Sequence, residues 1–324
     1  MRIYGFDILR GLCALAVAIC HICIWSDYAS PHIVGTVSVT LFFVLSGASM
    51  TIAYAERLKN GLPYPNFIAQ RLFRLAPLFW LLLLLSGRAF GTHFYQTLFN
   101  ASFLFSFGLS SNPTILVGSW SLGIEFLFYL IFPLMLMALS KKTAPFIFCF
   151  ALVMQQYYAS VADPAARDSL MFFIAYFFGG CMIGQSFLQP FRMRGCIAWP
   201  LFTAALLNLL YICTHADGIT FLGAAGAFLT MHCLALVYLA GHLNVAKKVL
   251  WVAVVMGDMS YGLYLLHPYV YHALRIIPGL QENRPLWPFM VIAVSIATAL
   301  MSEKYYEKPI RNFGYRFLKI RQYK

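Results

Sequence analysis

Long apolar runs recur along the whole chain, from residue 6 to residue 304, with only short polar stretches between them. Hydrophobic residues make up 61% of the 324 residues, charged residues only 10%, and the mean hydropathy is +0.75. A helix of about 20 apolar residues is long enough to cross a bilayer, and soluble globular domains do not have this composition. The chain is therefore predicted to be an all-helical, polytopic membrane protein.

We predict ten membrane-spanning segments within one integral-membrane domain, residues 1–324. The segments are 6–26, 34–55, 72–90, 117–139, 144–160, 168–188, 196–213, 218–240, 250–274 and 285–304. The broken apolar stretch 91–116 is expected to be a re-entrant or surface segment. With these segments, 19 of the 23 Lys and Arg residues fall on one side of the membrane. Since basic loops stay in the cytoplasm, both termini are predicted to be cytoplasmic, with the basic tail 305–324 along the anionic inner leaflet.

Several classes of protein are disfavoured. The net charge of +12 does not indicate nucleic-acid binding, because the basic residues sit in short loops between apolar runs. The eight cysteines lie in or beside those runs without the spacing of a disulfide framework. Cys20 and His21 are adjacent in sequence and point to different helix faces, so the Cys20, His21 and Cys23 cluster is not predicted to be a metal site. Asp7 disrupts the basic start of a cleaved signal peptide.

The first segment carries ionisable groups that an inert membrane anchor lacks. Arg10 and His21 are eleven residues apart, which places them within ~20° of the same helix face and ~16 Å apart along the axis. Such groups are costly in a membrane and usually functional. We predict that a long substrate with an anionic head lies along this face, in a hollow that joins the two residues.

Two further sets of polar residues are expected at different depths. Arg71 and Arg74 share a helix face, and their planar guanidinium groups suit phosphate; alternatively, they are ordinary charges that reach lipid phosphates. His21, Glu125 and His267 are expected to meet in the outer half, where Glu125 would orient a histidine. The alternatives are an interfacial role for His267 and a structural one for Glu125, with its carboxyl satisfied by backbone or Trp120.

A serine nucleophile is not indicated, because no G-x-S-x-G elbow stands in a suitable context. His21 is the better candidate, as a base that removes a proton from a hydroxyl. Several hydroxyl and carboxyl groups lie near the ends of segments, where they often join helices together. They include Ser46, Ser121, Asp258, Ser260, Tyr261 and Tyr264.

Six motifs in order resemble the acyltransferase 3 family, membrane-bound acyltransferases of bacterial surface glycans. They are FDILRGLCALAVAICH, TLFFVLSG, RLFRLAP, WSLGIEFLFYLIFP, MSYGLYLLHPYV and the late EKP. The resemblance covers essentially the whole chain, and it is greatest to stand-alone exopolysaccharide and O-antigen O-acetyltransferases. Glu125 is followed by Phe126 and Leu127, where many members have polar residues, and this departure concerns acceptor specificity.

The resemblance implies roles for particular residues. The catalytic set is His21, Glu125 and His267, and the donor-binding set is Arg10, Arg71, Arg74, Ser260 and Tyr261. It implies no resident cofactor or metal; acyl-CoA, commonly acetyl-CoA, is the donor substrate. The acceptor is a glycan or lipid-linked carbohydrate, and the location is the bacterial cytoplasmic (inner) membrane. Two other readings stay open: a proton-coupled transporter or flippase, and a non-catalytic membrane scaffold.

Overall fold

The structure is a computed structural model that describes residues 2–28, 32–86, 94–107, 114–139, 142–161, 169–189, 193–215, 223–277, 280 and 285–318. Within these ranges the chain forms helices and no strand, so the predicted all-helical class is confirmed. The α-helices are α1 (Tyr4–Trp25), α2 (His32–Lys59), α3 (Tyr64–Leu85), α4 (Phe94–Ala101), α5 (Ser119–Leu139), α6 (Ala144–Val161), α7 (Leu170–Ser186), α8 (Gly195–His215), α9 (Gly223–Gly241), α10 (Leu250–Arg275), α11 (Trp287–Ser302) and α12 (Lys308–Phe317). Short 3₁₀ turns cover Leu104–Phe107 (η1) and Lys247–Val249 (η3), and a π-helical turn covers Glu303–Glu307 (η4).

A long helix coincides with each of the ten predicted segments. In the described part of the chain, six are long and apolar enough to cross a membrane: α1, α2, α3, α5, α8 and α10. Helices α7 and α9 are apolar but shorter. The count of ten crossings, the orientation of the termini and the position of the tail at the inner leaflet therefore stay predictions.

Two boundaries differ from the prediction. Helix α3 begins at Tyr64, eight residues before the predicted start at 72, because the polar stretch with Arg71 and Arg74 continues the same helix. In the segment predicted to be re-entrant or at the surface, the described residues form α4 and η1 with short non-helical stretches at 102–103 and 114–116. Residues 91–93 and 108–113 of that segment lie outside the described residues.

Helices α2 and α7 pack closely because glycines lie at their contact. Gly47 of α2 approaches the carbonyl of Phe177 in α7, and Gly180 of α7 approaches the carbonyl of Val44 in α2, so tightly that neither position has room for a Cβ. Small residues allow membrane helices to approach in this way. The contact fixes how α2 is rotated against α7, and hence which α2 side chains face the interior.

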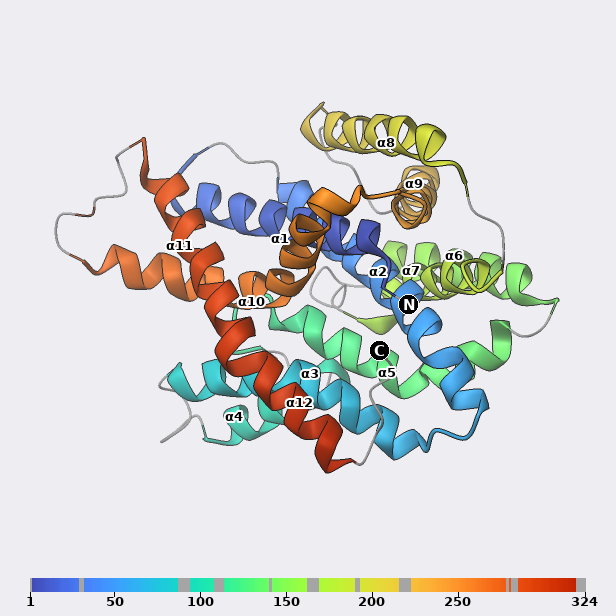
Figure 1. Ribbon diagram of the computed structural model, residues 1–324, viewed down its shortest axis with the longest axis horizontal. Helices are drawn as coiled ribbons and strands as arrows, with labels where there is room; N and C mark the ends of the chain where they lie inside the picture. Colours follow the sequence, from blue (N-terminus) through green and yellow to red (C-terminus); the bar gives the residue numbers. More distant parts are fainter. Residues whose placement is uncertain are drawn as a thin grey trace.

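The first and last helices both contribute residues to one space in the molecule. Helix α1 packs between α2 and α10, and α10 packs against α11. Helices α11 and α12 follow one another as a single long rod, red in Figure 1, which passes over α3, whereas α8 and α9 lie at the upper edge. Helix α12 rests on α3 through Gly314, which has no room for a side chain beside Phe73. Residues 2–10, 71–74 and 303–315 therefore surround one space.

Candidate active site

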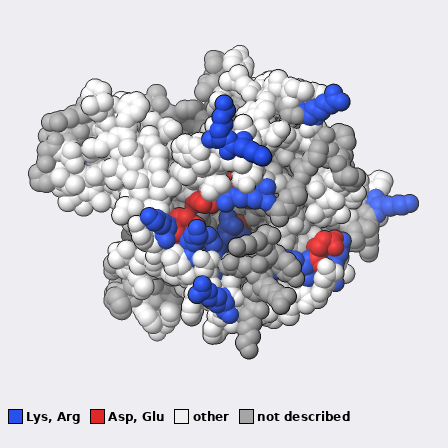
Figure 2. Space-filling view, in the orientation of Figure 1, with Lys and Arg blue, Asp and Glu red and all other residues white. Residues whose placement is uncertain are grey.

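A cavity of about 430 Å³ lies between α1, α2, α3, α5, α10 and the η4–α12 segment. Figure 2 shows basic and acidic side chains gathered around a hollow in the centre of a face that is otherwise largely uncharged. The charged residues that line the cavity are Arg2, Asp7, Arg10, Arg71, Arg74, Glu125, Asp258, Glu303, Glu307 and Arg311. In a chain with only 10% charged residues, this concentration marks the cavity as the site of interest.

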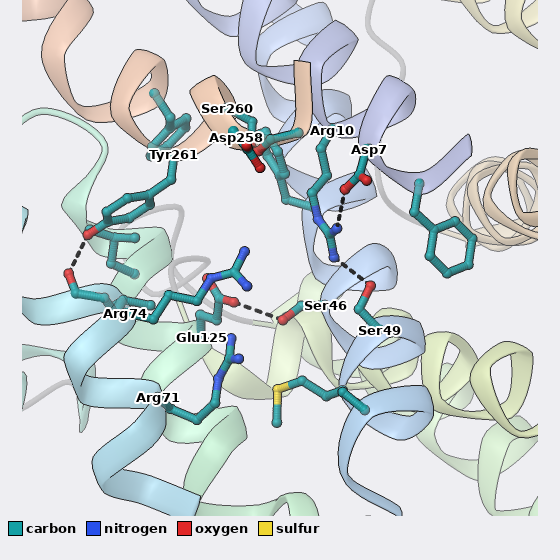
Figure 3. A pocket seen from close by; sticks show the side chains of 18 of the residues that line it. Asp7, Arg10, Ser46, Ser49, Arg71, Arg74, Glu125, Asp258, Ser260 and Tyr261 are labelled. Carbon is teal, nitrogen blue, oxygen red and sulfur yellow. Dashed lines mark hydrogen bonds and ion pairs between the residues drawn. The ribbon is translucent and has the colours of Figure 1, made fainter. Parts of the chain in front are cut away.

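Arg71 and Arg74 project from one face of α3 into the cavity, as their spacing predicted (Figure 3). Arg71 is only 8% exposed. It donates from Nη2 to the Tyr129 hydroxyl at 2.9 Å and stacks over that ring, 4.6 Å from its centre. The Nε of Arg71 is buried without a hydrogen-bond partner in the described structure. Arg74 is exposed to the cavity and forms neither a hydrogen bond nor an ion pair with a described residue.

Arg10 enters the cavity from α1, opposite the α3 arginines. Its guanidinium donates to the Ser49 hydroxyl at 2.5 Å and to the Leu45 carbonyl at 3.4 Å, and it lies 3.5 Å from the Asp7 carboxylate. Asp7 also accepts from Arg2 at 2.5 Å. The structure therefore brings Arg10, Arg71 and Arg74 to one cavity, as the sequence predicted, with Arg10 anchored by α2.

Glu125 lies on the arginine side of the site. Its Oε1 accepts hydrogen bonds from Ser46 at 2.8 Å and from Tyr129 at 2.5 Å. Tyr129 in turn accepts from Arg71, so the carboxylate and the guanidinium are joined through one phenol. Within the described residues Glu125 makes no hydrogen bond with either His21 or His267, and the expected meeting of all three groups does not occur. The signal for Tyr129 was present in the sequence, since it lies one helical turn after Glu125.

Ser260 and Tyr261 also line the cavity, where the resemblance placed them. The Ser260 hydroxyl donates to the Gly257 carbonyl of its own helix at 2.8 Å. The Tyr261 hydroxyl donates to the Leu75 carbonyl and so ties α10 to α3. Both residues thus line the cavity, while their hydroxyls are engaged in contacts with helix carbonyls.

No site role was predicted from the sequence for the C-terminal wall of the cavity, although Glu307 belongs to the EKP motif. Arg311 of α12 donates to both carboxylate oxygens of Glu303, at 2.7 and 3.4 Å. Glu307 accepts from the Ser302 hydroxyl at 2.7 Å. Burial raises the pKa of Glu307 to about 7, against the opposing effects of the Ser302 hydrogen bond and of Arg311 and Arg74. The π-helical turn η4 cannot be recognised from the sequence, yet such turns are frequent at functional sites and so mark this wall as a candidate.

His21 and His267 come together, as their predicted depth required. Nδ1 of His21 lies 2.9 Å from Nε2 of His267, and Nδ1 of His267 lies 3.0 Å from the Leu263 carbonyl. A carbonyl only accepts, so the Nδ1 of His267 carries a proton. In neutral His267 the Nε2 is then an acceptor, and the bonding proton belongs to Nδ1 of His21. This tautomer leaves the Nε2 of neutral His21 without a proton, which is the form a general base needs.

The hollow expected to join Arg10 to His21 stops short. The described lining of the cavity includes Arg10 and Tyr264 but neither His21 nor His267. Tyr264 precedes His267 by three residues on α10, and the two rings stand edge to face with centres 6.5 Å apart. The prediction was incomplete because helix periodicity fixes the face on which a residue lies but not the side chain that fills the space beside it.

The described residues include six helices able to cross a membrane, and five of them, α1, α2, α3, α5 and α10, line an interior polar site. These features define the class: an integral membrane protein with a buried polar site. A family model described as an acyltransferase domain matches residues 3–302. The chain belongs to this family, acyltransferase 3, and the resemblance seen in the motifs is confirmed.

Curated relatives are similar over almost the whole chain. YrhL of Bacillus subtilis (strain 168) is 25% identical over 96% of this chain and 55% of that protein. The peptidoglycan O-acetyltransferase OatA of Listeria monocytogenes serovar 1/2a is 26% identical over 96% of this chain and 56% of that protein. The acyltransferase MdmB of Streptomyces mycarofaciens is 30% identical over 41% of this chain and 39% of that protein. The chain spans about half the length of the first two relatives. No solved structure matches it.

Proposed function

We propose that the protein is an O-acyltransferase of the cytoplasmic membrane of bacteria, which moves an acyl group, most simply acetyl, from acyl-CoA to a hydroxyl of a surface glycan. The observation that carries this proposal is the pairing of a cavity lined by arginines with a histidine pair just beyond its end. Family membership supports acyl transfer. The crossing count of ten, with both termini in the cytoplasm, belongs to the same proposal.

The arginines would hold the phosphates of the donor. Arg74 has no partner in the described structure, and Arg71 keeps one buried N–H without a hydrogen bond. A buried, unsatisfied donor costs free energy, and a phosphate oxygen would satisfy it. A guanidinium binds phosphate with a planar, two-point geometry that an ammonium group does not offer. Arg10, across the cavity, would face the same ligand, and the basic side of the membrane would be the side from which CoA enters.

Glu125 would act on the donor side and not at the histidines. Through Tyr129 it holds the Arg71 guanidinium in place, and its charge balances part of the positive charge of an empty cavity. We therefore assign Glu125 and Tyr129 as positioning residues for the donor-binding arginines. The proposal that Glu125 orients a histidine is replaced by this role.

His21 would act as the general base. Its unprotonated Nε2 takes the proton of the acceptor hydroxyl as the oxygen attacks the thioester carbon; the C–O bond forms, the C–S bond breaks, and the CoA thiolate leaves and is protonated. His267, fixed by the Leu263 carbonyl, would hold His21 in the required tautomer. Water in place of the hydroxyl would give the free carboxylic acid and CoA.

The acceptor is proposed to be peptidoglycan or a related glycan, because a relative that spans 96% of this chain is a peptidoglycan O-acetyltransferase. The test is a direct assay: the purified protein in lipid nanodiscs, radiolabelled acetyl-CoA, and peptidoglycan fragments as acceptor. We expect release of CoA and label in the glycan, both lost with His21→Ala at normal protein level. Loss of an ester from envelope glycans of cells without the gene would identify the acceptor. A wild-type protein that neither hydrolyses nor transfers acetyl overturns the proposal.

A further inference from the structure

We propose that Tyr264 is a gate between the donor cavity and the histidine pair, which closes the cavity when no donor is bound and turns aside for the acyl arm. This inference rests on the proposed function, because that function requires the thioester to reach His21. It assigns a positioning role to Tyr264, a residue between the cavity and His267 that takes no chemical step itself. It also explains why the cavity and the histidines are separate in the structure.

The position of Tyr264 is that of a partition. It lines the cavity on one side, and on the other its ring meets the edge of the His267 ring. Phe42 of α2 completes the wall, with its ring edge to face against Tyr264 at 5.9 Å. His267 is 1% exposed. A ligand in the cavity therefore meets an aromatic wall one helical turn before it reaches the histidine pair.

Hydrogen bonds to oxygen atoms at the start of α5 hold the Tyr264 side chain in the closed position. The Tyr264 hydroxyl lies 3.0 Å from the Gly118 carbonyl and 2.8 Å from the Ser121 hydroxyl, which itself lies 2.9 Å from the same carbonyl. The Tyr264 and Ser121 hydroxyls have one hydrogen each, so at most two of these three contacts are hydrogen bonds at any time. Each hydrogen bond contributes only about 1 kcal/mol net, which makes the closed position stable but reversible.

Gly118 makes this seat possible. Its φ of +76° lies in the left-handed region, and a Cβ at this position would stand 3.0 Å from the Tyr264 hydroxyl. A residue with a side chain is disfavoured there on both counts. The backbone at Gly118 thus leaves room for the Tyr264 hydroxyl in the closed position.

A closed gate has a physical purpose in this protein. Figure 2 shows the hollow open at the surface, so water reaches the arginines. If that water also reached the histidine base, the thioester would be hydrolysed before an acceptor arrived. A wall that opens only for the acyl arm keeps water in the cavity from reaching the histidine pair by this route until transfer, as closing elements do in other enzymes.

The first test does not depend on acyl transfer. Diethyl pyrocarbonate modifies accessible histidines, and mass spectrometry of tryptic peptide 249–275 reports His267 together with exposed His272 as an internal reference. We expect Tyr264→Ala to raise the labelling rate of His267 relative to His272 by about tenfold, equivalent to ~1.4 kcal/mol. Tyr264→Phe, which loses only the hydroxyl contacts, should give a smaller rise.

Two controls separate a gate from general damage. Tyr269→Ala removes a tyrosine from the same helix outside the cavity lining and should leave His267 labelling unchanged. His242, buried in the turn just after α9, should stay unlabelled in every folded variant. An unchanged His267 rate in Tyr264→Ala, or an equal rise in Tyr269→Ala, overturns the gate.

The second test measures coupling. In Tyr264→Ala the ratio of acetyl-CoA hydrolysis to acyl transfer should rise severalfold, whereas a merely structural role would lower both rates together. An unchanged ratio overturns the inference. Absence of acetyl-CoA turnover in the wild-type protein would instead overturn the proposed function, and the labelling result would still decide whether Tyr264 closes off the histidine pair.

Discussion

Nδ1 of His21 lies 2.9 Å from Nε2 of His267, although 246 residues separate the two in the chain. The pair joins the first helix to α10, and the Leu263 carbonyl sets the direction of its hydrogen bonds. The Nε2 of neutral His21 then carries no proton, so it is the nitrogen that can accept one. His21 is therefore the residue to replace in a test of the proposed general base.

His21→Ala should lower acyl transfer by about 10²–10⁴-fold, the usual contribution of a general base. Donor affinity should stay near the wild-type value, since His21 does not line the described cavity. Steady-state kinetics and equilibrium binding of a non-hydrolysable acetyl-CoA analogue measure the two quantities. His232→Ala, on α9 with its ring against the Ala205 carbonyl, is the matched control. Full transfer by His21→Ala would exclude the proposed base.

Arg71→Lys should weaken donor binding by about tenfold, since it keeps the charge but loses the guanidinium fork. Arg74→Lys should do the same, and the two changes should affect saturated turnover much less. Isothermal titration of the analogue at two salt concentrations gives the affinity and its electrostatic share. Lys59→Ala, a basic residue paired with Glu56 outside the cavity lining, serves as control. If both arginine variants bound the donor with wild-type affinity, Arg71 and Arg74 would not form the donor site.

Tyr129→Phe removes the hydroxyl that joins Arg71 to Glu125. We expect a donor dissociation constant about tenfold higher, equivalent to ~1.4 kcal/mol, with saturated turnover largely retained. Glu125→Gln should behave similarly, because the carboxylate that accepts the Tyr129 hydrogen bond, and so holds Arg71 in place, is lost. Rapid kinetics at saturating donor separate the two effects. A fall in turnover at unchanged affinity would instead place Glu125 with the histidines.

Glu307 predicts a dependence of stability on pH. Burial raises its pKa from an ordinary value of 4.5 to about 7, so between these values the folded protein binds more protons than the unfolded chain. Stability should therefore fall as pH rises from about 4.5 to about 7, by a few kcal/mol, at ~1.4 kcal/mol per pKa unit. It should then stay level above that range.

Thermal unfolding of the detergent-solubilised protein at pH 5 and pH 8 measures this effect. Glu307→Gln should remove most of the difference between the two pH values. Glu56→Gln, at an exposed carboxylate paired with Lys59, should leave the difference as it is in the wild type. An identical pH difference in Glu307→Gln would show that other groups cause it.

The sequence by itself determined the all-helical class, the positions of the long helices and the family. It also placed Arg71 and Arg74 on one face, because a helix repeats every ~3.6 residues whatever surrounds it. Runs of apolar residues and fixed spacings are local properties. They do not depend on how the helices pack against one another, so they can be recognised in a single sequence.

Only the tertiary structure decided which polar groups meet. It paired His21 with His267, gave Glu125 to Tyr129 and Ser46, and put Tyr264 across the end of the cavity. These contacts depend on how each helix is rotated and shifted against its neighbours. That register is fixed by close approaches such as Gly180 against the Val44 carbonyl, which join residues far apart in the chain and leave no periodic trace in the sequence.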